Sequence, residues 1–197
     1  MSARAVIIRA GGTNFGSLLA ACARLGVAAT VSDQATTIRA ASHVILPGVG
    51  AAAPAMRHLR ESGLDRVIAG LRQPLLGICL GMQLLFERLA EGEVDGLGLL
   101  PGRVERLPAA PRWPHMGWNT LATTRPHPLL AGIGSADWFY FVHGYAASGA
   151  ADTIACCVHG QPFAAAVARG QVAGMQFHPE KSAAAGRRAL ANFFALT

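Results

Sequence analysis

The sequence predicts an α/β protein built on a doubly wound, open and mostly parallel sheet with an antiparallel extension. In the first half of the chain, short apolar runs alternate with segments of helical periodicity, the pattern of successive βαβ units. From residue 138 onward, apolar runs follow one another with only short turns between them, which indicates paired strands. A cysteine between two glycines ends one of the apolar runs of the first half and marks the place where we expect chemistry.

Length and composition indicate one domain. With 197 residues, of which 52% are hydrophobic and 14% charged, the chain can bury a sizeable core, so we expect residues 1–197 to form a single domain. The apolar runs are interrupted before the roughly 18 residues that a membrane span requires. The N-terminus looks like a first strand, not a signal peptide, and four cysteines without a regular framework indicate reduced thiols. We therefore expect a cytoplasmic protein without membrane contact.

The first half supplies the parallel part of the sheet. Its expected strands are 5–8, 28–31, 43–46 and 75–78, and its expected helices are 17–25, 51–60 and 64–71. In sheets of this kind, ligands bind beyond the carboxyl ends of the strands. The glycines of 48–50 and the cysteine at 79 both follow such strand ends.

The stretch Leu75–Gln83 carries the clearest sign of catalysis. Gly77-x-Cys79-x-Gly81 has the spacing of the Gly-x-Ser-x-Gly nucleophile elbow, with sulfur in place of oxygen. Glycines at both flanks allow the tight turn that exposes a nucleophile, and helical spacing continues to residue 89. The amide of Leu80 would begin that helix, where an unpaired N–H favours a thiolate or an oxyanion.

Most cysteines are small buried apolar residues, and we interpret Cys22, Cys156 and Cys157 in that way. The same interpretation holds for Cys79 unless a base lies nearby. His178 and Glu180 can supply it: if 172–180 is extended, side chains at i and i+2 share a face and the carboxylate can orient the imidazole. A surface histidine beside an unrelated glutamate is the alternative for this pair.

The second half is expected to be mainly β. Glycine and proline are frequent between 92 and 128, where only short pieces such as 103–107 look like strands. The consecutive strands expected after this region are 138–142, 153–158, 163–169 and 172–177, as a mixed or antiparallel extension of the sheet. A helix over 182–196 closes the chain, with Ser182 as its candidate N-cap.

The net charge of +6 does not predict nucleic-acid binding. All but one of the 17 basic residues are arginines scattered along the chain, and no nucleic-acid module is visible. Solvated surface charge is the simpler interpretation, and an anionic protein partner is the other. Cys156 and Cys157 face opposite sides of a strand and lack zinc-type spacing with His159, so we expect no metal. A cofactor is not expected either.

Five ordered motifs carry a resemblance to a known family. Gly77–Gln83 and Gln176–Ser182 resemble the class I, triad-type glutamine amidotransferases. Leu46–Ala51, Pro114–Asn119 and Tyr140–His143 are similar, within that family, to the glutaminase subunits of imidazole glycerol phosphate synthase. The resemblance spans the chain from first strand to last helix. It implies the class I amidotransferase fold, hydrolysis of L-glutamine to glutamate and ammonia, and a heterodimer with a (β/α)8-barrel cyclase of histidine biosynthesis.

The resemblance also implies roles for the matching residues. Cys79 would be the nucleophile, His178 the proton carrier and Glu180 the residue that orients it. The resemblance implies an oxyanion hole formed by Val49, Gly50 and Leu80. It implies glutamine contacts from Gln83, His143, Gly144 and Tyr145. It implies a docking face that contains Asn14, Trp118, Tyr140 and Lys181. From the residues alone, an ordinary turn is the simpler interpretation of 47–50, and Gln83 could equally be a polar contact inside a helix.

Departures from the family and alternative functions both bear on these roles. Gly144 stands where the family usually has Ser or Thr, and Arg9-Ala10 replaces its usual Asp-Tyr. Another pathway's amidotransferase, or a γ-glutamyl peptidase, would keep the triad but should lack the His115–Asn119 stretch. A non-catalytic binding subunit would keep the fold and lose the triad.

Overall fold

The computed structural model describes residues 4–10, 15–108 and 112–197. Strands and helices alternate in the first half, as the sequence predicts. Its elements are β1 Arg4–Ile8, α1 Phe15–Arg24, β2 Ala28–Ser32, α2 Ala35–Arg39, β3 His43–Gly48, α3 Ala52–Glu61, α4 Leu64–Ala69, β4 Leu75–Cys79 and α5 Leu80–Gln83. None of the helices in these described ranges is both long and apolar enough to cross a membrane.

The second half is mainly β and ends in one long helix. Its elements are β5 Phe86–Leu89, β6 Val94–Asp95, β7 Leu100–Arg106, β8 His115–Thr120, β9 Ala122–Thr123, η1 Pro128–Leu130, β10 Trp138–His143, β11 Tyr145–Ala147, β12 Thr153–His159, β13 Gln161–Arg169, β14 Val172–Met175, η2 Pro179–Lys181 and α6 Ala183–Phe194. The two η elements are single 3₁₀ turns.

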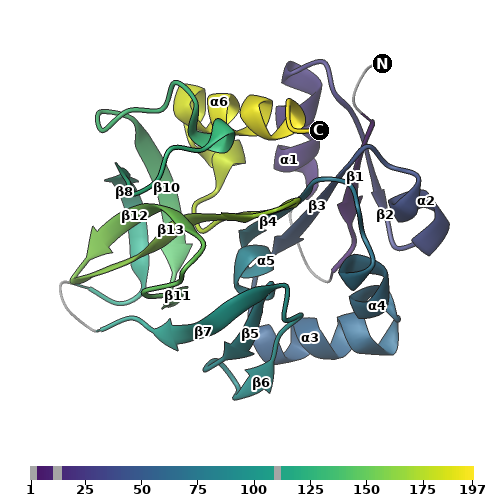
Figure 1. Cartoon of the computed structure of the whole chain (residues 1–197), viewed down its shortest axis with the longest axis horizontal. Helices are drawn as coiled ribbons and strands as arrows, with labels where there is room; N and C mark the ends of the chain where they lie inside the picture. Colours follow the sequence, from purple (N-terminus) through teal and green to yellow (C-terminus); the bar gives the residue numbers. More distant parts are fainter. Residues whose placement is uncertain (1–3, 11–14, 109–111) are drawn as a thin grey trace.

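An eight-stranded sheet with the order β2-β1-β3-β4-β14-β13-β12-β9 forms the centre of the molecule (Figure 1). The strands from β2 to β14 in this order pair in parallel. The pairs β14–β13, β13–β12 and β12–β9 are antiparallel. The predicted mostly parallel sheet with an antiparallel extension is therefore confirmed.

Two hydrophobic clusters cover the two faces of this sheet. Ile7, Ile45 and Leu76 pack with residues of α1 and α6 on one face. On the other face, Val44 and Leu46 pack with residues of α2, α3 and α4. Figure 1 shows α1 and α6 on one side of the sheet and α3 and α4 on the other. Neighbouring strand residues alternate between the clusters because successive side chains of a strand point to opposite faces. The carboxyl ends of β3, β4 and β14 meet at one edge, where the site lies.

The prediction that a helix continues from Cys79 to residue 89 is wrong. α5 is a single turn, and the chain then forms β5, which pairs with β6 and β7. The carbonyl of Leu85, which a longer helix would use internally, instead accepts from the amides of Leu99 and Leu100 at 2.8 and 2.9 Å. The returning segment thus competes with the helix for the same backbone groups.

The strands of the second half do not all join the main sheet. β10, expected as part of the extension, pairs with β8 in a separate two-stranded sheet, and β11-β7-β5-β6 form a third. Phe139 and Phe141 of β10 are fully buried in the core. β10 therefore packs face-on against the central structure, and its backbone pairs with β8 instead of β12.

Candidate active site

Cys79 occupies a strained turn at the end of β4. Its φ of 54° and ψ of −114° lie outside the regions that non-glycine residues ordinarily adopt. A Cβ on Gly77 would lie 2.7 Å from the backbone of Met82, and one on Gly81 would lie 1.8 Å from the Leu46 carbonyl oxygen. Neither flanking position therefore has room for a side chain. The structure thus has the backbone geometry of a nucleophile elbow, as the glycine spacing predicts.

The loop after β3 lies directly against this elbow. A Cβ on Gly48 would lie 2.8 Å from the amide nitrogen of Gly81. The two segments of backbone therefore approach too closely for any residue larger than glycine at position 48. Val49 and Gly50 follow and line the same cavity as Leu80. The Leu80 amide begins α5, where a helix leaves N–H groups without intrahelical partners. The three predicted oxyanion-hole residues are therefore neighbours in space.

His178 and Glu180 interact, but not through the predicted extended strand. β14 ends at Met175, and Pro179–Lys181 form the 3₁₀ turn η2. This turn brings Glu180 Oε1 to 2.8 Å from His178 Nδ1. Proline fits this location because its missing N–H is not needed at the first position of a helical turn. The predicted contact is present, whereas the predicted backbone for it was wrong.

The environment of His178 favours its charged form. Its side chain is 6% exposed and that of Glu180 is 10% exposed. Burial alone would lower the pKa of His178, but the side chains of Cys79 and Glu180 overcome this effect and raise it from 6.5 to about 10. His178 Nε2 has no hydrogen-bond partner of ordinary geometry in the described part of the chain. The ring lines the same cavity as Cys79, whose side chain interacts with it, and Nε2 is the ring nitrogen not used by Glu180.

Tyr140 and Ser182 hold the catalytic segment in place. The His178 amide donates to the Tyr140 carbonyl at 2.9 Å. The Ser182 hydroxyl donates to the His178 carbonyl at 2.7 Å and accepts from the Tyr140 amide at 2.9 Å. Ser182 makes no side-chain cap on α6, so the N-cap hydrogen bond considered from the sequence is absent. Its hydroxyl instead ties His178 to β10.

One cavity of about 280 Å³ collects most of the predicted site residues. Its lining comprises Val49, Gly50, Cys79, Leu80, Gln83, Glu91, Val142, His143, Gly144, Tyr145, His178 and Lys181. Glu180 lies behind His178 and lines the adjoining cavity that contains Pro47 and Gly48. Among the predicted residues, Asn14 lies outside the described ranges.

Two buried glutamines connect the cavity to the nucleophile. Gln83 Nε2 donates to the Tyr145 carbonyl at 2.8 Å and to Gln176 Oε1 at 3.0 Å. Gln176 Nε2 lies 3.8 Å from Cys79 Sγ, and the thiol lies 3.7 Å from the Val142 carbonyl. Sequence reasoning did not assign Gln176 a role, although it belongs to the motif that contains His178. The Gln83 amide group makes the polar contacts within the protein that were considered, and the residue also lines the cavity.

Glu91 is a second residue that sequence reasoning missed. Its carboxylate lines the cavity and accepts from the amide of Ala52, the first residue of α3, at 2.9 Å. A carboxylate at this position satisfies one of the amides that a helix start leaves unpaired. No motif surrounds Glu91 in the sequence, and only the return of the chain through β5 and β6 brings it here.

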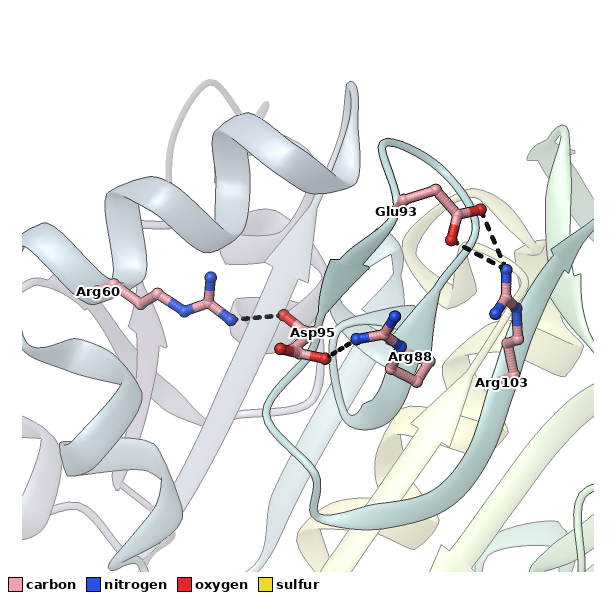
Figure 2. A network of polar contacts seen from close by, with 5 residues as sticks. All are labelled: Arg60, Arg88, Glu93, Asp95 and Arg103. Atoms are coloured by element: carbon pink, nitrogen blue, oxygen red, sulfur yellow. Dashed lines mark hydrogen bonds and ion pairs between the residues drawn. The ribbon is translucent and has the colours of Figure 1, made fainter.

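A polar network ties down the turn that carries Glu91 (Figure 2). Arg60 Nη2 of α3 donates to the Asp95 carbonyl at 2.7 Å, and Arg88 pairs with the Asp95 carboxylate. Arg103 of β7 pairs with Glu93 at 3.0 Å. These contacts link the turn and its flanking strands to α3 and β7, although exposed ion pairs contribute little stability individually.

The wall of the cavity near Gly144 is shaped by Trp113. The indole Nε1 donates to the Gly144 carbonyl at 2.9 Å, and the Leu107 amide donates to the same oxygen at 2.9 Å. His143 Nδ1 lies 2.9 Å from the Tyr145 carbonyl. The carbonyl groups of Gly144 and Tyr145 are therefore held by several donors of the protein.

Of the predicted docking residues in the described ranges, Trp118 and Tyr140 lie on the outer face of the β8–β10 sheet, and Lys181 lies in η2. Trp118 and Tyr140 are paired in register, with ring centroids 6.0 Å apart. Lys181 is exposed at the rim of the cavity, and its Nζ lies 5.8 Å from the centroid of the Tyr140 ring. Met116, Trp118 and Trp138 are 64%, 50% and 55% exposed. Exposed apolar side chains gathered on one face are typical of a protein interface.

Comparisons with known proteins agree with this geometry. A family model described as glutamine amidotransferase class-I matches residues 6–196. The imidazole glycerol phosphate synthase subunit HisH of Xanthomonas euvesicatoria pv. vesicatoria (strain 85-10) is 52% identical over 193 residues, which cover 97% of this chain and 96% of that one. The protein of the same name from Xylella fastidiosa (strain Temecula1 / ATCC 700964) is 51% identical over 189 residues, covering 95% and 94%.

A solved structure supports the fold independently. The crystal structure of a glutamine amidotransferase superposes with a TM-score of 0.75 at 22% identity and covers 96% of both chains. This likeness supports the fold alone.

Proposed function

The chain belongs to the class I glutamine amidotransferase family, and from this premise we propose how its site works. It hydrolyses L-glutamine to glutamate and ammonia as the glutaminase subunit of an imidazole glycerol phosphate synthase. One observation carries the proposal of mechanism: His178, held by Glu180 at 2.8 Å through Nδ1, lines the same cavity as Cys79, and its Nε2 has no other partner among the described residues.

Cys79 Sγ attacks the carbon of the substrate's side-chain amide. His178, which interacts with the Cys79 side chain, takes up the thiol proton, and the imidazolium that forms is stabilised by Glu180. The imidazolium then protonates the departing nitrogen and the C–N bond breaks. Ammonia is released, and the acyl group remains bound to Cys79 as a thioester. Water, deprotonated by His178, attacks the thioester and releases glutamate and the thiol.

The negative charge on the amide oxygen is held by main-chain donors. Leu80 at the start of α5 and the Val49–Gly50 segment line the cavity beside Cys79. Each well-placed donor of this kind lowers the barrier by about 3 kcal/mol. The tight contact between Gly48 and Gly81 sets the distance between the two donor segments.

The remaining lining groups suit the amino-acid end of glutamine. Glu91 presents a carboxylate that can pair with the α-ammonium group. Gln83 and the Gly144–Tyr145 main chain border the same space and supply polar contacts. We place the substrate between these groups, with its amide directed at Cys79.

Ammonia released into water becomes protonated, so a glutaminase of this kind serves a synthase that receives the ammonia directly. We propose a (β/α)8-barrel cyclase as the partner. The support is the subunit name of the relatives and the exposed apolar face of β8 and β10. Val142 and Lys181 line the cavity beside this face, so a docked partner would cover its mouth.

The four cysteines are free thiols, which suits a reducing compartment, and we propose that the enzyme works in the cytoplasm. The proposed activity is tested by measuring glutamate formation from glutamine with the purified chain, alone and with the cyclase and its substrate. We expect turnover that rises when the loaded cyclase is added. Absence of glutamate under both conditions would contradict the proposal.

A further inference from the structure

A chain of hydrogen bonds leads from β8 to the glutamine cavity without passing through the triad. Asn119 Nδ2 lies 3.5 Å from His115 Nε2, and His115 Nδ1 lies 3.1 Å from His143 Nε2. His143 Nδ1 lies 2.9 Å from the carbonyl oxygen of Tyr145. His115 is 3% exposed and His143 is 6% exposed, so neither ring can rely on bulk water for its hydrogen bonds.

With both rings neutral, one arrangement of protons satisfies every contact of this chain. The Tyr145 carbonyl can only accept, so His143 Nδ1 must carry its proton. The bare Nε2 of His143 then accepts from His115 Nδ1, which leaves His115 Nε2 bare. That nitrogen accepts from the Asn119 amide group, a donor through Nδ2.

The neighbours of Asn119 orient its amide in the same sense. Nδ2 donates to the Val158 carbonyl at 2.9 Å, while Oδ1 accepts from the Thr120 amide at 2.9 Å. Burial lowers the pKa of His115 to about 4 and that of His143 to about 3, so both rings are neutral near pH 7. The donors and acceptors therefore alternate without conflict from Asn119 to Tyr145.

The series of hydrogen bonds ends at Tyr145, in the lining of the substrate cavity. The Tyr145 carbonyl accepts from Gln83 Nε2 as well as from His143, and all three residues line the cavity. Both ring nitrogens of His143 are used inside the protein. Its influence on a bound substrate must therefore pass through the backbone of Tyr145.

We infer that His115 and Asn119 are positioning residues for the glutamine site, because they help to hold His143, from its Nε2 side, in the Nδ1–H tautomer that donates to the Tyr145 carbonyl. The inference rests on the proposed function only in naming glutamine as the occupant of the cavity. The inference gives His115 and Asn119, the inward side chains of β8, a role distinct from that of Met116 and Trp118, which lie exposed on the same strand.

The tautomers are tested on the full chain labelled with ¹⁵N-histidine. Two-bond ¹H–¹⁵N correlation spectra at pH 7 distinguish Nδ1–H from Nε2–H rings, and free histidine prefers Nε2–H. We expect Nδ1–H for both His115 and His143, with signals assigned by single substitutions. An Nε2–H ring at either position would overturn the inference. This readout is independent of activity, so it fails or succeeds separately from the proposed function.

Kinetics test the positioning role. His115→Phe keeps a ring stacked on Phe141 but removes the donor to His143. We expect the KM for glutamine to rise about tenfold, the factor that corresponds to one hydrogen bond of ordinary strength, with a smaller change in kcat. The matched control is His159→Phe, since the His159 ring stacks on the His115 ring with centroids 4.1 Å apart but takes no part in the series of hydrogen bonds from Asn119 to Tyr145.

The control should leave the KM and the His143 tautomer unchanged. Equal effects of the two substitutions would overturn the positioning role, because both remove a histidine from the same stack. If His115→Phe does not fold, Asn119→Leu removes the other donor of the chain. The expected result is then a mixed tautomer at His115 with a raised KM, and a single unchanged tautomer with wild-type KM would contradict the inference.

Discussion

Gly144 and Trp113 compete for one volume: a Cβ on Gly144 would lie 2.6 Å from Cζ2 of the Trp113 indole. The indole also donates to the Gly144 carbonyl at 2.9 Å. This contact explains the glycine at a position where the resemblance implies Ser or Thr. The aromatic ring takes the space of the missing side chain and holds the main chain that the proposed substrate contacts.

The contact predicts that Gly144→Ser is harmful only while Trp113 is present. In the wild-type background we expect a loss of about 1–3 kcal/mol of stability, the usual cost of overpacking, and weaker glutamine binding. In a Trp113→Ala background the added serine should cost less. Urea unfolding and KM measurements on the four proteins of this double-mutant cycle provide the check. Strictly additive effects would show that the two residues do not compete.

The elbow predicts a sharp difference between two glycines. Gly81→Ala places a Cβ 1.8 Å from the Leu46 carbonyl oxygen, so α5 and β3 must move apart. We expect the free energy of unfolding to fall by about 3 kcal/mol and glutaminase activity to be lost. Gly134→Ala is the control because its Cβ would meet no atom within 4 Å. Similar stabilities of the two variants would refute the close approach at the elbow.

Glu180→Gln tests the role of the carboxylate. The amide keeps the shape but not the charge that stabilises the imidazolium, so kcat should fall roughly 10³- to 10⁴-fold. A variant with full activity and a lower thermal midpoint would make Glu180 a structural residue.

The same variant has a second readout in the pH dependence of stability. The folded-state pKa of His178 is raised from 6.5 to about 10, so its charge stabilises the fold fully below pH 6.5 and this contribution disappears as the pH rises toward 10. Wild type should therefore lose more stability than Glu180→Gln between pH 6.5 and 10. Since Cys79 also raises this pKa, the variant should keep part of the dependence; unfolding curves at pH 6, 8 and 9.5 measure the difference, and parallel losses would exclude Glu180 as a cause.

Lys181→Ala tests communication with the partner. The ammonium group lies at the cavity rim, near the Tyr140 ring, where a carboxylate of the cyclase can reach it. We expect normal stability but a smaller stimulation of glutamine hydrolysis by the loaded cyclase. Arg39→Ala removes an exposed cation from α2 and serves as the control. Stimulation as strong as in wild type would exclude Lys181 from this role.

The parallel half of the fold and the elbow could be predicted because their signals are local. Glycines flanking Cys79 reflect contacts that leave no room for a Cβ, and the apolar runs of β1, β3 and β4 reflect strands buried on both faces. The helix expected after the elbow failed because its apolar spacing also suits β5. Only the return of residues 97–100 to the carbonyls of Leu84 and Leu85 decides between the two.

Glu91, one of the residues missed at the site, is placed by distant parts of the chain. Glu91 reaches the cavity because β5 and β6 fold back toward α3, and the sequence around it has no catalytic pattern. The contact between His178 and Glu180 was expected from two residues on one strand face, yet a 3₁₀ turn makes it. An i, i+2 pair can meet through either backbone, so spacing alone does not reveal which one forms.

The central claim is that Cys79 attacks glutamine and that the ammonia then feeds the cyclase. The most direct measurement compares Cys79→Ser with wild type in complex with the cyclase, using either glutamine or an ammonium salt as nitrogen source. We predict that the variant loses glutamine-dependent synthesis of imidazole glycerol phosphate and keeps ammonium-dependent synthesis at the wild-type rate. Glutamine-dependent synthesis that survives the substitution would contradict the account.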